Sequence, residues 1–476
     1  MGLSKKWGLF LGPLLFLVLI SLPSTLISEQ ADAVIAVALW MIVWWITEAV
    51  SISVTALLPL LLFPILKIIP MEDVGANYGS PIVFLFFGGF VMALALEKVN
   101  LHKRIALTII KITGTTPNKV ILGFMIATAS LSMWISNTAS TVVMLPIAMS
   151  VIQLLIHDAD GFTKSDRNFA LSVMLGIAFS ANAGGIATVI GTPPNSVLIG
   201  LLENEYNIEI SFLKWMVVGL PFSIIMLACC YLVLVKFLFP NGALKFNASR
   251  TIIDGELKKL GPTSGKEKMV LTIFGITVFL WVFRTVLNSI FPFLGLSDAM
   301  ISMFAAIALF AVPFNLKKGD FILEWKDTQK LAWGILVLFG GGLALAQGMS
   351  VTGIVDLVAG VIAESDISVL FTAALLIFLM LFMTELMSNV ALVAVLAPVV
   401  AGIAIGLGLP IVYLLIPITM ASSCAFMLPM ATPPNAIVFA SGYIKVHEMA
   451  KAGFLLNVIA VLLLIGLFQF ILPFLF

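Results

Sequence analysis

Two stretches of the chain repeat one another at a distance of 252 residues. Residues 132–146 read SMWISNTASTVVMLP, and residues 384–398 read TELMSNVALVAVLAP. Both stretches carry a Ser-Asn pair that interrupts a long apolar run, at 136–137 and again at 388–389. An amide inside such a run is unfavourable unless its hydrogen bonds are satisfied. The recurrence therefore indicates a duplicated unit with a polar centre.

Two further motifs follow the same duplication. Phe87-Gly88-Gly89 recurs as Phe339-Gly340-Gly341, again 252 residues on, and Thr192-Pro193-Pro194-Asn195 recurs as Thr432-Pro433-Pro434-Asn435, 240 residues on. The deficit of 12 residues matches the polar stretch 157–168, which has no counterpart in the second half. This order predicts repeats at 31–240 and 269–476, preceded by an extra N-terminal membrane helix at 1–30 and joined by a cytoplasmic linker at 241–268.

The composition identifies the environment of these repeats. Of the 476 residues, 61% are hydrophobic and only 10% are charged, against about 25% in ordinary soluble domains. A soluble globule must cover itself with polar groups, so a soluble enzyme, a disordered chain and a fibrous protein are excluded. The sequence predicts an all-α polytopic membrane protein with about 11 transmembrane helices, two re-entrant hairpins and helices broken at the midplane.

Charge and cysteine content exclude further classes of function. The 25 basic and 24 acidic residues give a net charge of +1. The chain therefore lacks the excess of basic residues that is typical of nucleic-acid-binding proteins. Of the three cysteines two are neighbours, Cys229 and Cys230, and all three lie in apolar stretches, while the three histidines are scattered along the chain. They offer no disulfide framework, zinc site or catalytic triad, so we expect no enzyme.

The basic residues predict how the chain is oriented. Lys5 and Lys6 precede the first apolar run, and seven Lys and Arg residues lie between Lys236 and Lys268. By the positive-inside rule both segments face the cytoplasm, and the uncharged segment 454–476 is then consistent with an external C-terminus. The first apolar run resembles a signal peptide but lacks a small-x-small cleavage site, so we expect a retained span. Five repeat spans after one extra helix would make the repeats inverted, which is typical of secondary transporters.

The Ser-Asn pairs are candidate binding groups. We interpret each as a place where a helix unwinds, so that freed carbonyls and hydroxyls can ligate a cation while the next helix start holds an anion. Ser132 and Thr384 each lie four residues before the Ser of the nearby pair. This spacing places the two hydroxyls of each half on one helix face, which adds a hydroxyl ligand to each pair. The alternatives are polar contacts between helices, or hydroxyls that bond back to their own helix.

The proline and glycine motifs are weaker signals. Adjacent prolines cannot lie inside a helix, so each Thr-Pro-Pro-Asn segment predicts either a cavity-lining break or a simple helix end near the interface. The Phe-Gly-Gly motifs fit the tips or walls of re-entrant hairpins, with close helix packing as the alternative. Three charges lie deep in apolar runs, Glu48, Arg284 and Glu385. Glu385 orients the nearby Ser-Asn segment, accepts a proton, or has a structural partner, and Arg284 could simply extend to the interface.

The scarcity of deep basic residues bears on the substrate. An anion bound among these motifs would have to be neutralised by cations bound with it and by helix N-termini. A channel would need a charged selectivity ring, and a membrane-embedded enzyme would need clustered His, Asp or Cys; the sequence shows neither.

With both Ser-Asn pairs followed by a Thr-Pro-Pro-Asn segment, the chain resembles the divalent anion/sodium symporter family, the sodium-coupled dicarboxylate, citrate and sulfate carriers. The resemblance covers essentially the whole chain. It implies a homodimer in the plasma membrane, a bacterial inner membrane, in which a transport domain moves like an elevator against a scaffold.

The resemblance also implies ligand sets. The first sodium ion would be held by Ser132, Ser136, Asn137 and the Gly191 backbone, and the second by Thr384, Ser388, Asn389 and the Ala431 backbone. The substrate would meet Ser136, Asn137, Thr138, Thr192, Ser388, Asn389, Val390, Thr432 and Pro433.

One position departs from the family pattern. Val390 stands where the family often has Thr, so a contact there is by packing or backbone only. The bacterial-type length favours C4-dicarboxylates such as succinate, malate and fumarate. A sodium-coupled sulfate or citrate carrier of the same fold, and a dicarboxylate exchanger, remain alternatives.

Overall fold

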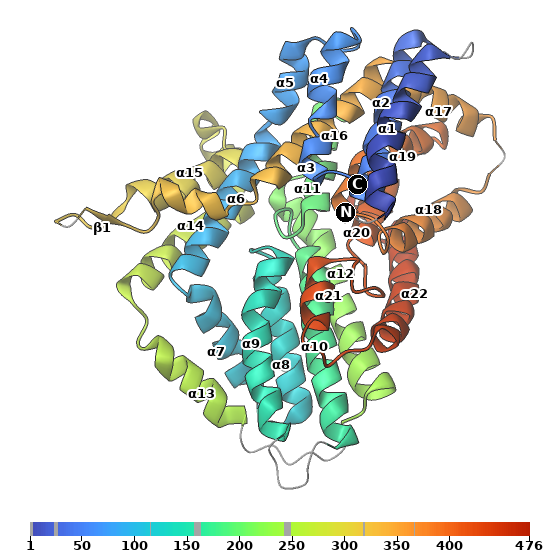
Figure 1. Ribbon diagram of the computed structural model, residues 1–476. Coiled ribbons are helices and arrows are strands. Elements are labelled where there is room, and N and C mark those ends of the chain that lie inside the picture. Colours follow the sequence, from blue (N-terminus) through green and yellow to red (C-terminus); the bar gives the residue numbers. More distant parts are fainter. Residues whose placement is uncertain are drawn as a thin grey trace.

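The computed structural model describes residues 3–22, 27–114, 116–156, 163–241, 249–317, 319–365 and 367–476. Their regular elements are helices apart from one short strand pair (Figure 1). The helices of the first half are α1 (Leu3–Ser21), α2 (Glu29–Thr47), α3 (Ile52–Thr55), α4 (Leu58–Ile65), α5 (Met71–Tyr78), α6 (Pro81–Lys98), α7 (Leu101–Thr113), α8 (Pro117–Ser132), α9 (Asn137–Ile156), α10 (Lys164–Gly185), α11 (Pro193–Tyr206), α12 (Phe212–Leu232) and the π-helix η1 (Val233–Leu238).

The linker contains α13 (Ser249–Leu260), and the other elements come after it in the chain. They are α14 (Gly265–Ile290), η2 (Pro292–Leu294), α15 (Asp298–Ala311), the antiparallel strands β1 (Pro313–Asn315) and β2 (Asp320–Phe321), η3 (Trp325–Lys330), α16 (Trp333–Val351), α17 (Ile354–Ala363), α18 (Val369–Met383), α19 (Asn389–Gly406), α20 (Ile411–Ser422), α21 (Pro433–Phe439), α22 (Val446–Phe470) and α23 (Leu472–Leu475).

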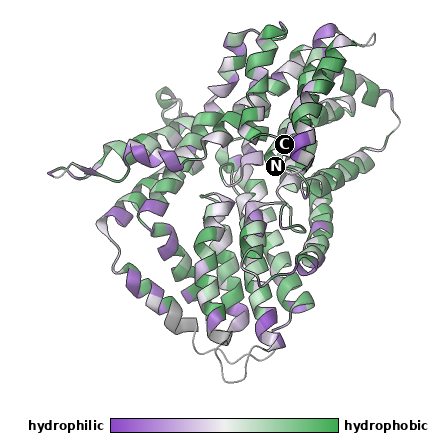
Figure 2. Cartoon of the chain, in the orientation of Figure 1, coloured by the Kyte–Doolittle hydropathy of each residue, from purple (hydrophilic) through white to green (hydrophobic). Residues whose placement is uncertain are grey.

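The apolar helices confirm the predicted class, an all-α integral membrane protein. Within the described residues seven helices are long and apolar enough to cross a membrane. They are Glu29–Thr47, Met71–Lys98, Phe212–Leu238, Gly265–Ile290, Trp333–Val351, Asn389–Gly406 and Val446–Phe470. Hydrophilic residues gather along α13 and at the lower ends of α8, α9 and α10 (Figure 2). The numbers of crossings and hairpins stay predictions.

The duplication read from the sequence is visible in the helices. α6 and α16 begin 252 residues apart, at Pro81 and Trp333, and α9 and α19 begin 252 apart, at their Asn residues. α11 and α21 begin 240 apart, each at the first proline of a Thr-Pro-Pro-Asn segment. In Figure 1, α8, α9 and α10 lie below the centre of the molecule, whereas α17 and α19 lie above it. This arrangement fits two repeats that approach the centre from opposite sides.

The structure corrects the place of the helix breaks. α8 ends at Ser132, α9 starts at Asn137, and the two helices pack side by side. The Ser-Asn pair therefore lies at a turn between two helices and not inside one unwound helix. The interrupted helix is instead the pair α10 and α11, in which residues 186–192 lie unwound and buried. Proline explains this break, because it starts a helix well but cannot continue one.

The Phe-Gly-Gly motifs are not the tips of hairpins, so that part of the prediction is wrong, while their place in the wall of a hairpin stays a prediction. Both motifs lie inside the continuous helices α6 and α16. A Cβ on Gly88 would lie 2.6 Å from the carbonyl oxygen of Ser302, and one on Gly341 would collide with the Ala56 carbonyl. The glycines therefore allow close helix packing, which was the alternative.

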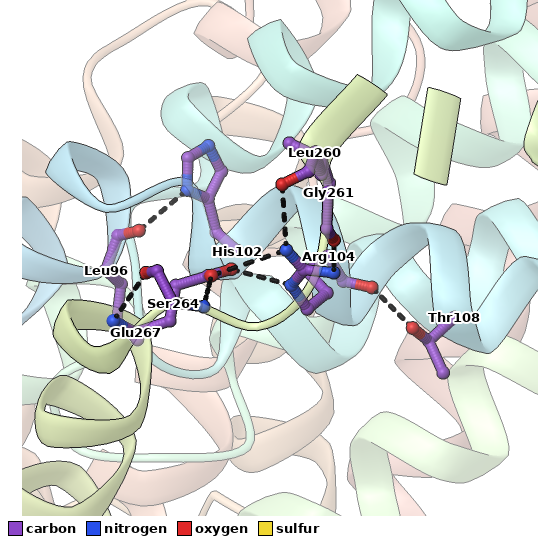
Figure 3. Close-up of polar contacts among 8 residues, drawn as sticks. All are labelled: Leu96, His102, Arg104, Thr108, Leu260, Gly261, Ser264 and Glu267. Atoms are coloured by element: carbon purple, nitrogen blue, oxygen red, sulfur yellow. Dashed lines mark hydrogen bonds and ion pairs between the residues drawn. The ribbon is translucent and has the colours of Figure 1, made fainter. Parts of the chain in front are cut away.

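Arg104 is one of the residues that anchor the central linker to the first half (Figure 3), together with the ion pair between Lys111 and Asp254. Arg104 on α7 donates to the Glu267 carboxylate at 2.6 Å and to the carbonyls of Leu260 and Gly261 at 3.2 and 3.0 Å. Ser264 and Glu267 form the capping box that begins α14. One side chain thus fixes the end of α13, the start of α14 and α7 together. Residues 242–248 of the linker lie outside the described residues.

Candidate substrate and cation site

A cavity of about 500 Å³ lies where the two halves meet. All nine residues predicted to meet the substrate line it, namely Ser136, Asn137, Thr138, Thr192, Ser388, Asn389, Val390, Thr432 and Pro433. Ala431 lines it too, whereas Gly191 lines an adjoining cavity of about 110 Å³ that shares Ser136 and Pro193. Ser132 and Thr384 are fully buried behind the lining. Residues up to 300 positions apart therefore converge on one space.

The first oxygen cluster surrounds the Ser132 hydroxyl. Its Oγ lies 2.5 Å from Asn137 Oδ1 and 2.8 Å from the carbonyl oxygen of Ala181 on α10. The hydroxyl has one proton and faces two acceptors, so the cluster holds more lone pairs than donors. Neutral oxygens in such excess suit a hard cation.

The second oxygen cluster repeats this geometry around Thr384. Its Oγ1 lies 2.7 Å from Asn389 Oδ1 and 2.7 Å from the carbonyl oxygen of Ser422 on α20. Again one hydroxyl proton serves two acceptors. The back-bonding alternative, in which these hydroxyls pair with their own helices, does not describe either cluster, because both reach a carbonyl on another helix.

Glycine keeps the first cluster tight. A Cβ on Gly185 would lie 2.5 Å from Asn137 Oδ1, and one on Gly191 would lie 2.5 Å from the Gly185 carbonyl oxygen. Any larger residue at either position would therefore push the unwound segment away from the amide. The second half has Ala431 where the first has Gly191.

Helix N-termini supply positive potential at the cavity. α9 and α19 begin at its lining residues Asn137 and Asn389. Ser136 Oγ accepts from the Ala139 amide at 3.1 Å, and Ser388 caps α19 in the same way. The cavity-lining residues of the described chain include no Lys or Arg. Lys330 lines the adjoining smaller cavity, and the Glu48 carboxylate lines this one. Helix dipoles and bound cations are thus the means by which the larger cavity can neutralise an anion.

The asparagines of the two Thr-Pro-Pro-Asn segments have a structural role that the sequence reading did not assign. Asn195 Nδ2 donates to the carbonyls of Gly185 and Thr188 at 3.3 and 2.8 Å. Asn435 Nδ2 donates to Ala425 and Leu428 at 3.1 and 3.0 Å, at the positions 240 residues on. Each amide therefore satisfies carbonyls that the unwound chain leaves without a helical partner. The signal was present in the sequence, since Asn ends both repeated motifs.

Glu385 holds the second unwound segment. Its Oε1 accepts from the backbone amides of Phe426 and Met427 at 2.8 and 2.9 Å and from Asn457 Nδ2 at 2.8 Å. Its Oε2 accepts from Met427 and from Leu428, both at 3.1 Å. Five contacts to groups that can only donate show a structural partner set that orients the segment.

The other two deep charges also have partners. Glu48 lines the cavity and pairs with Lys5 at 3.0 Å, with most of its side chain exposed. Arg284 on α14 pairs with Glu209 at 2.6 Å and with Asp298 at 3.4 Å. Arg284 is thus part of a charge cluster and does not simply extend to the interface.

Solved transporter structures resemble this fold. The Alcanivorax borkumensis YdaH transporter aligns with a TM-score of 0.56 at 13% identity, over 84% of this chain and 88% of its own. Neisseria gonorrhoeae MtrF, described as one of a class of antimetabolite efflux pumps, aligns with a TM-score of 0.54 at 13% identity, over 95% and 97%. At this identity the likeness concerns the fold alone.

Together, the membrane helices, the duplicated architecture and the central polar cavity define a membrane transporter. The chain belongs to the sodium:sulfate symporter family, whose transmembrane region it matches over residues 3–475. The sodium-dependent dicarboxylate transporter SdcS of Staphylococcus saprophyticus is 38% identical over 473 residues, 98% of this chain and 91% of that protein. SdcS of Staphylococcus aureus is 38% identical over 472 residues, with the same coverage.

Proposed function

We propose that the protein is a secondary active transporter that carries C4-dicarboxylates such as succinate, malate and fumarate into the cell together with sodium ions. The observation that carries this proposal is the pair of matched oxygen clusters on one cavity that has no Lys or Arg in its described lining. A dianion bound there needs bound cations, because helix N-termini alone compensate only about half a charge each. Relatives named as sodium-dependent dicarboxylate transporters support the same ions and substrate.

The ligand sets follow the two clusters. The first sodium ion is held by Ser132, Ser136, Asn137 and the Gly191 carbonyl, and the second by Thr384, Ser388, Asn389 and the Ala431 carbonyl. The substrate carboxylates take hydrogen bonds from the Ser-Asn turns and from Thr138, Thr192 and Thr432, while Val390 and Pro433 pack against the carbon chain. At least two sodium ions accompany each substrate.

The transport cycle follows from the duplication. The repeats 31–240 and 269–476, with the helix at 1–30 and the linker at 241–268, are inverted, and each contributes to a scaffold and to a transport domain. The transport domain carries the cavity across the inner membrane by an elevator movement, and the scaffolds join two chains as a homodimer. The N-terminus is cytoplasmic and the C-terminus external.

A sulfate carrier is the second candidate, because the family is described by sodium:sulfate symport. Citrate transport and dicarboxylate exchange are the other activities that an experiment has to distinguish from succinate symport. Pocket size alone does not separate them, since a cavity of about 500 Å³ admits each of these anions.

The test is uptake into liposomes that contain the purified protein. Radiolabelled succinate should accumulate under an inward sodium gradient and not under a matched potassium gradient. Unlabelled sulfate and citrate are then added as competitors. Succinate uptake that ignores sodium would contradict the cation clusters and favour exchange, which preloaded dicarboxylate would reveal.

Two variants link the uptake to the clusters. Ser132→Ala and Thr384→Val each remove one hydroxyl, so the sodium concentration for half-maximal uptake should rise about tenfold. Ser172→Ala is the matched control, because this hydroxyl is buried on α10 and has no hydrogen-bond partner in the described chain. Equal sodium dependence in all three variants would refute the assignment of the clusters.

A further inference from the structure

One side chain of the first half reaches into the unwound segment of the second. Asn182 lies on α10 with 1% of its surface exposed. Its Nδ2 donates to the Ala425 carbonyl at 3.0 Å and to Thr432 Oγ1 at 3.2 Å, and it lies 3.5 Å from Asn435 Oδ1. All three acceptors belong to the segment that carries the second Thr-Pro-Pro-Asn motif.

Among the described residues, no side chain of the second half makes the matching link to the first unwound segment. The residue 240 positions after Asn182 is Ser422, whose hydroxyl bonds within its own helix to the Thr419 carbonyl at 2.7 Å. Ser423 follows the Ser422 carbonyl of the second cluster as Asn182 follows the Ala181 carbonyl of the first, and its buried hydroxyl has no hydrogen-bond partner in the described chain. The carbonyls of the first unwound segment are bonded by Asn195, Ser196 and Trp215, which all belong to the same half. The second segment is bonded by Asn435 and Glu385 of its own half, and in addition by Asn182 of the other half. The duplication alone does not explain Asn182, so its contacts point to a task specific to the second segment.

The contact determines which way the Thr432 hydroxyl points. Thr432 Oγ1 faces two donors, Asn182 Nδ2 at 3.2 Å and the Asn435 backbone amide at 3.4 Å. An amide can only donate through its nitrogen, so both lone pairs of the hydroxyl are used and its proton is directed elsewhere. Thr432 lines the cavity, so an acceptor bound there can take this proton. Thr192, the matching residue, makes no side-chain cap bond.

We propose that Asn182 is a positioning residue for substrate recognition: it orients the Thr432 hydroxyl as a hydrogen-bond donor to a carboxylate in the cavity. This inference rests on the proposed function, because it takes the substrate to be an anion bound beside Thr432. Asn182 itself does not touch the substrate. Its position next to Ala181, whose carbonyl belongs to the first oxygen cluster, places this contact beside the first cation site.

The experiment is a double-mutant cycle on the full-length protein in liposomes. Asn182→Leu keeps the branched shape and the number of side-chain heavy atoms and removes the donor, so the KM for succinate at saturating sodium should rise about tenfold. Thr432→Val removes the hydroxyl and should raise KM by a similar factor. If Asn182 acts through Thr432, the double variant should be no worse than Thr432→Val alone. Ser180→Ala is the control, since this buried hydroxyl on α10 has no hydrogen-bond partner in the described chain.

The outcomes separate the two levels of the proposal. Wild-type uptake driven by sodium, with Asn182→Leu indistinguishable from Ser180→Ala, would overturn the role of Asn182 and leave the proposed function intact. If the increases in KM of the two single variants multiply in the double variant, the role of Asn182 would also be overturned, because the two residues would then act independently. Absence of sodium-driven succinate uptake in the wild type would overturn the proposed function and this inference with it.

A second comparison does not depend on the folding of the Asn182 variant. Thr432→Ser keeps the hydroxyl with its two donors, so it should keep a KM within about threefold of the wild type, whereas Thr432→Val should not. Equal KM values for these two variants would show that no donor is needed at Thr432, and the inference would fail.

Discussion

Replacing Glu385 by glutamine tests how the proposed second cation site is held. The variant keeps one acceptor oxygen and turns an NH2 group toward amides that can only donate. The Leu428 amide, 3.1 Å from Oε2, then loses its partner, and the bonds from Phe426 and Met427 lose their charge assistance. An unsatisfied buried amide costs about 1–3 kcal/mol, and a bond to a charged group contributes more than a neutral one. The total loss is about 3 kcal/mol, confined to the unwound segment.

This loss should appear as weaker sodium binding. The segment supplies the Ala431 backbone to the proposed second site, and about 3 kcal/mol corresponds to at most a roughly hundredfold rise in the sodium concentration at half-saturation. The assay is thermal unfolding of the purified protein across a sodium titration, with potassium keeping the ionic strength constant. In the wild type, sodium at a hundred times its Kd should stabilise the protein by about 2.7 kcal/mol.

The control is Glu364→Gln, which changes the same side chain at an exposed position after α17. It should leave both the melting temperature and the sodium titration unchanged. The reasoning would be refuted if Glu385→Gln melts at the wild-type temperature and its sodium concentration at half-saturation stays within twofold of the wild-type value. The carboxylate contacts would then contribute nothing to sodium binding.

Three further changes have definite expected results. Asn137→Ala and Asn389→Ala should each abolish uptake while the protein stays folded in the membrane, because each removes an amide oxygen from one cluster; normal uptake by either variant would contradict the site. Arg104→Ala should destabilise the protein by about 3 kcal/mol, by breaking a largely buried ion pair, without changing the KM for sodium, as thermal unfolding and uptake would show. Gly341→Ala should lower the melting temperature by several degrees, since its Cβ collides with a backbone carbonyl, whereas Gly360→Ala, which meets nothing, should not; equal melting temperatures would show that the close packing is not required.

The sequence was enough to predict the class of fold and the residues of the cavity. The repeat of Ser-Asn and Thr-Pro-Pro-Asn at spacings of 252 and 240 residues identified the polar motifs, and the family resemblance that they carry implied nine substrate positions. All nine line one cavity. The structural consequence of such motifs can be predicted from the sequence, because a polar amide or a double proline in an apolar run has few structural explanations. The roles of these residues in binding stay predictions.

The local geometry was less predictable. The Ser-Asn pairs occupy turns between helices, and the interrupted helices lie at the proline motifs instead, because a break and a turn give the same sequence signal. The Phe-Gly-Gly motifs pack helices together, since glycine permits both a bend and a close approach.

Composition and repeated motifs determined that this chain is a duplicated membrane protein with a polar centre, because burial in lipid restricts both composition and backbone structure. Only the tertiary structure decided which oxygens meet. The Ser132 and Thr384 hydroxyls pair with carbonyls of Ala181 and Ser422, and Asn182 reaches the opposite half. A carbonyl is present at every residue, so no sequence pattern distinguishes the one that contributes to a site; its position is set by how the helices pack.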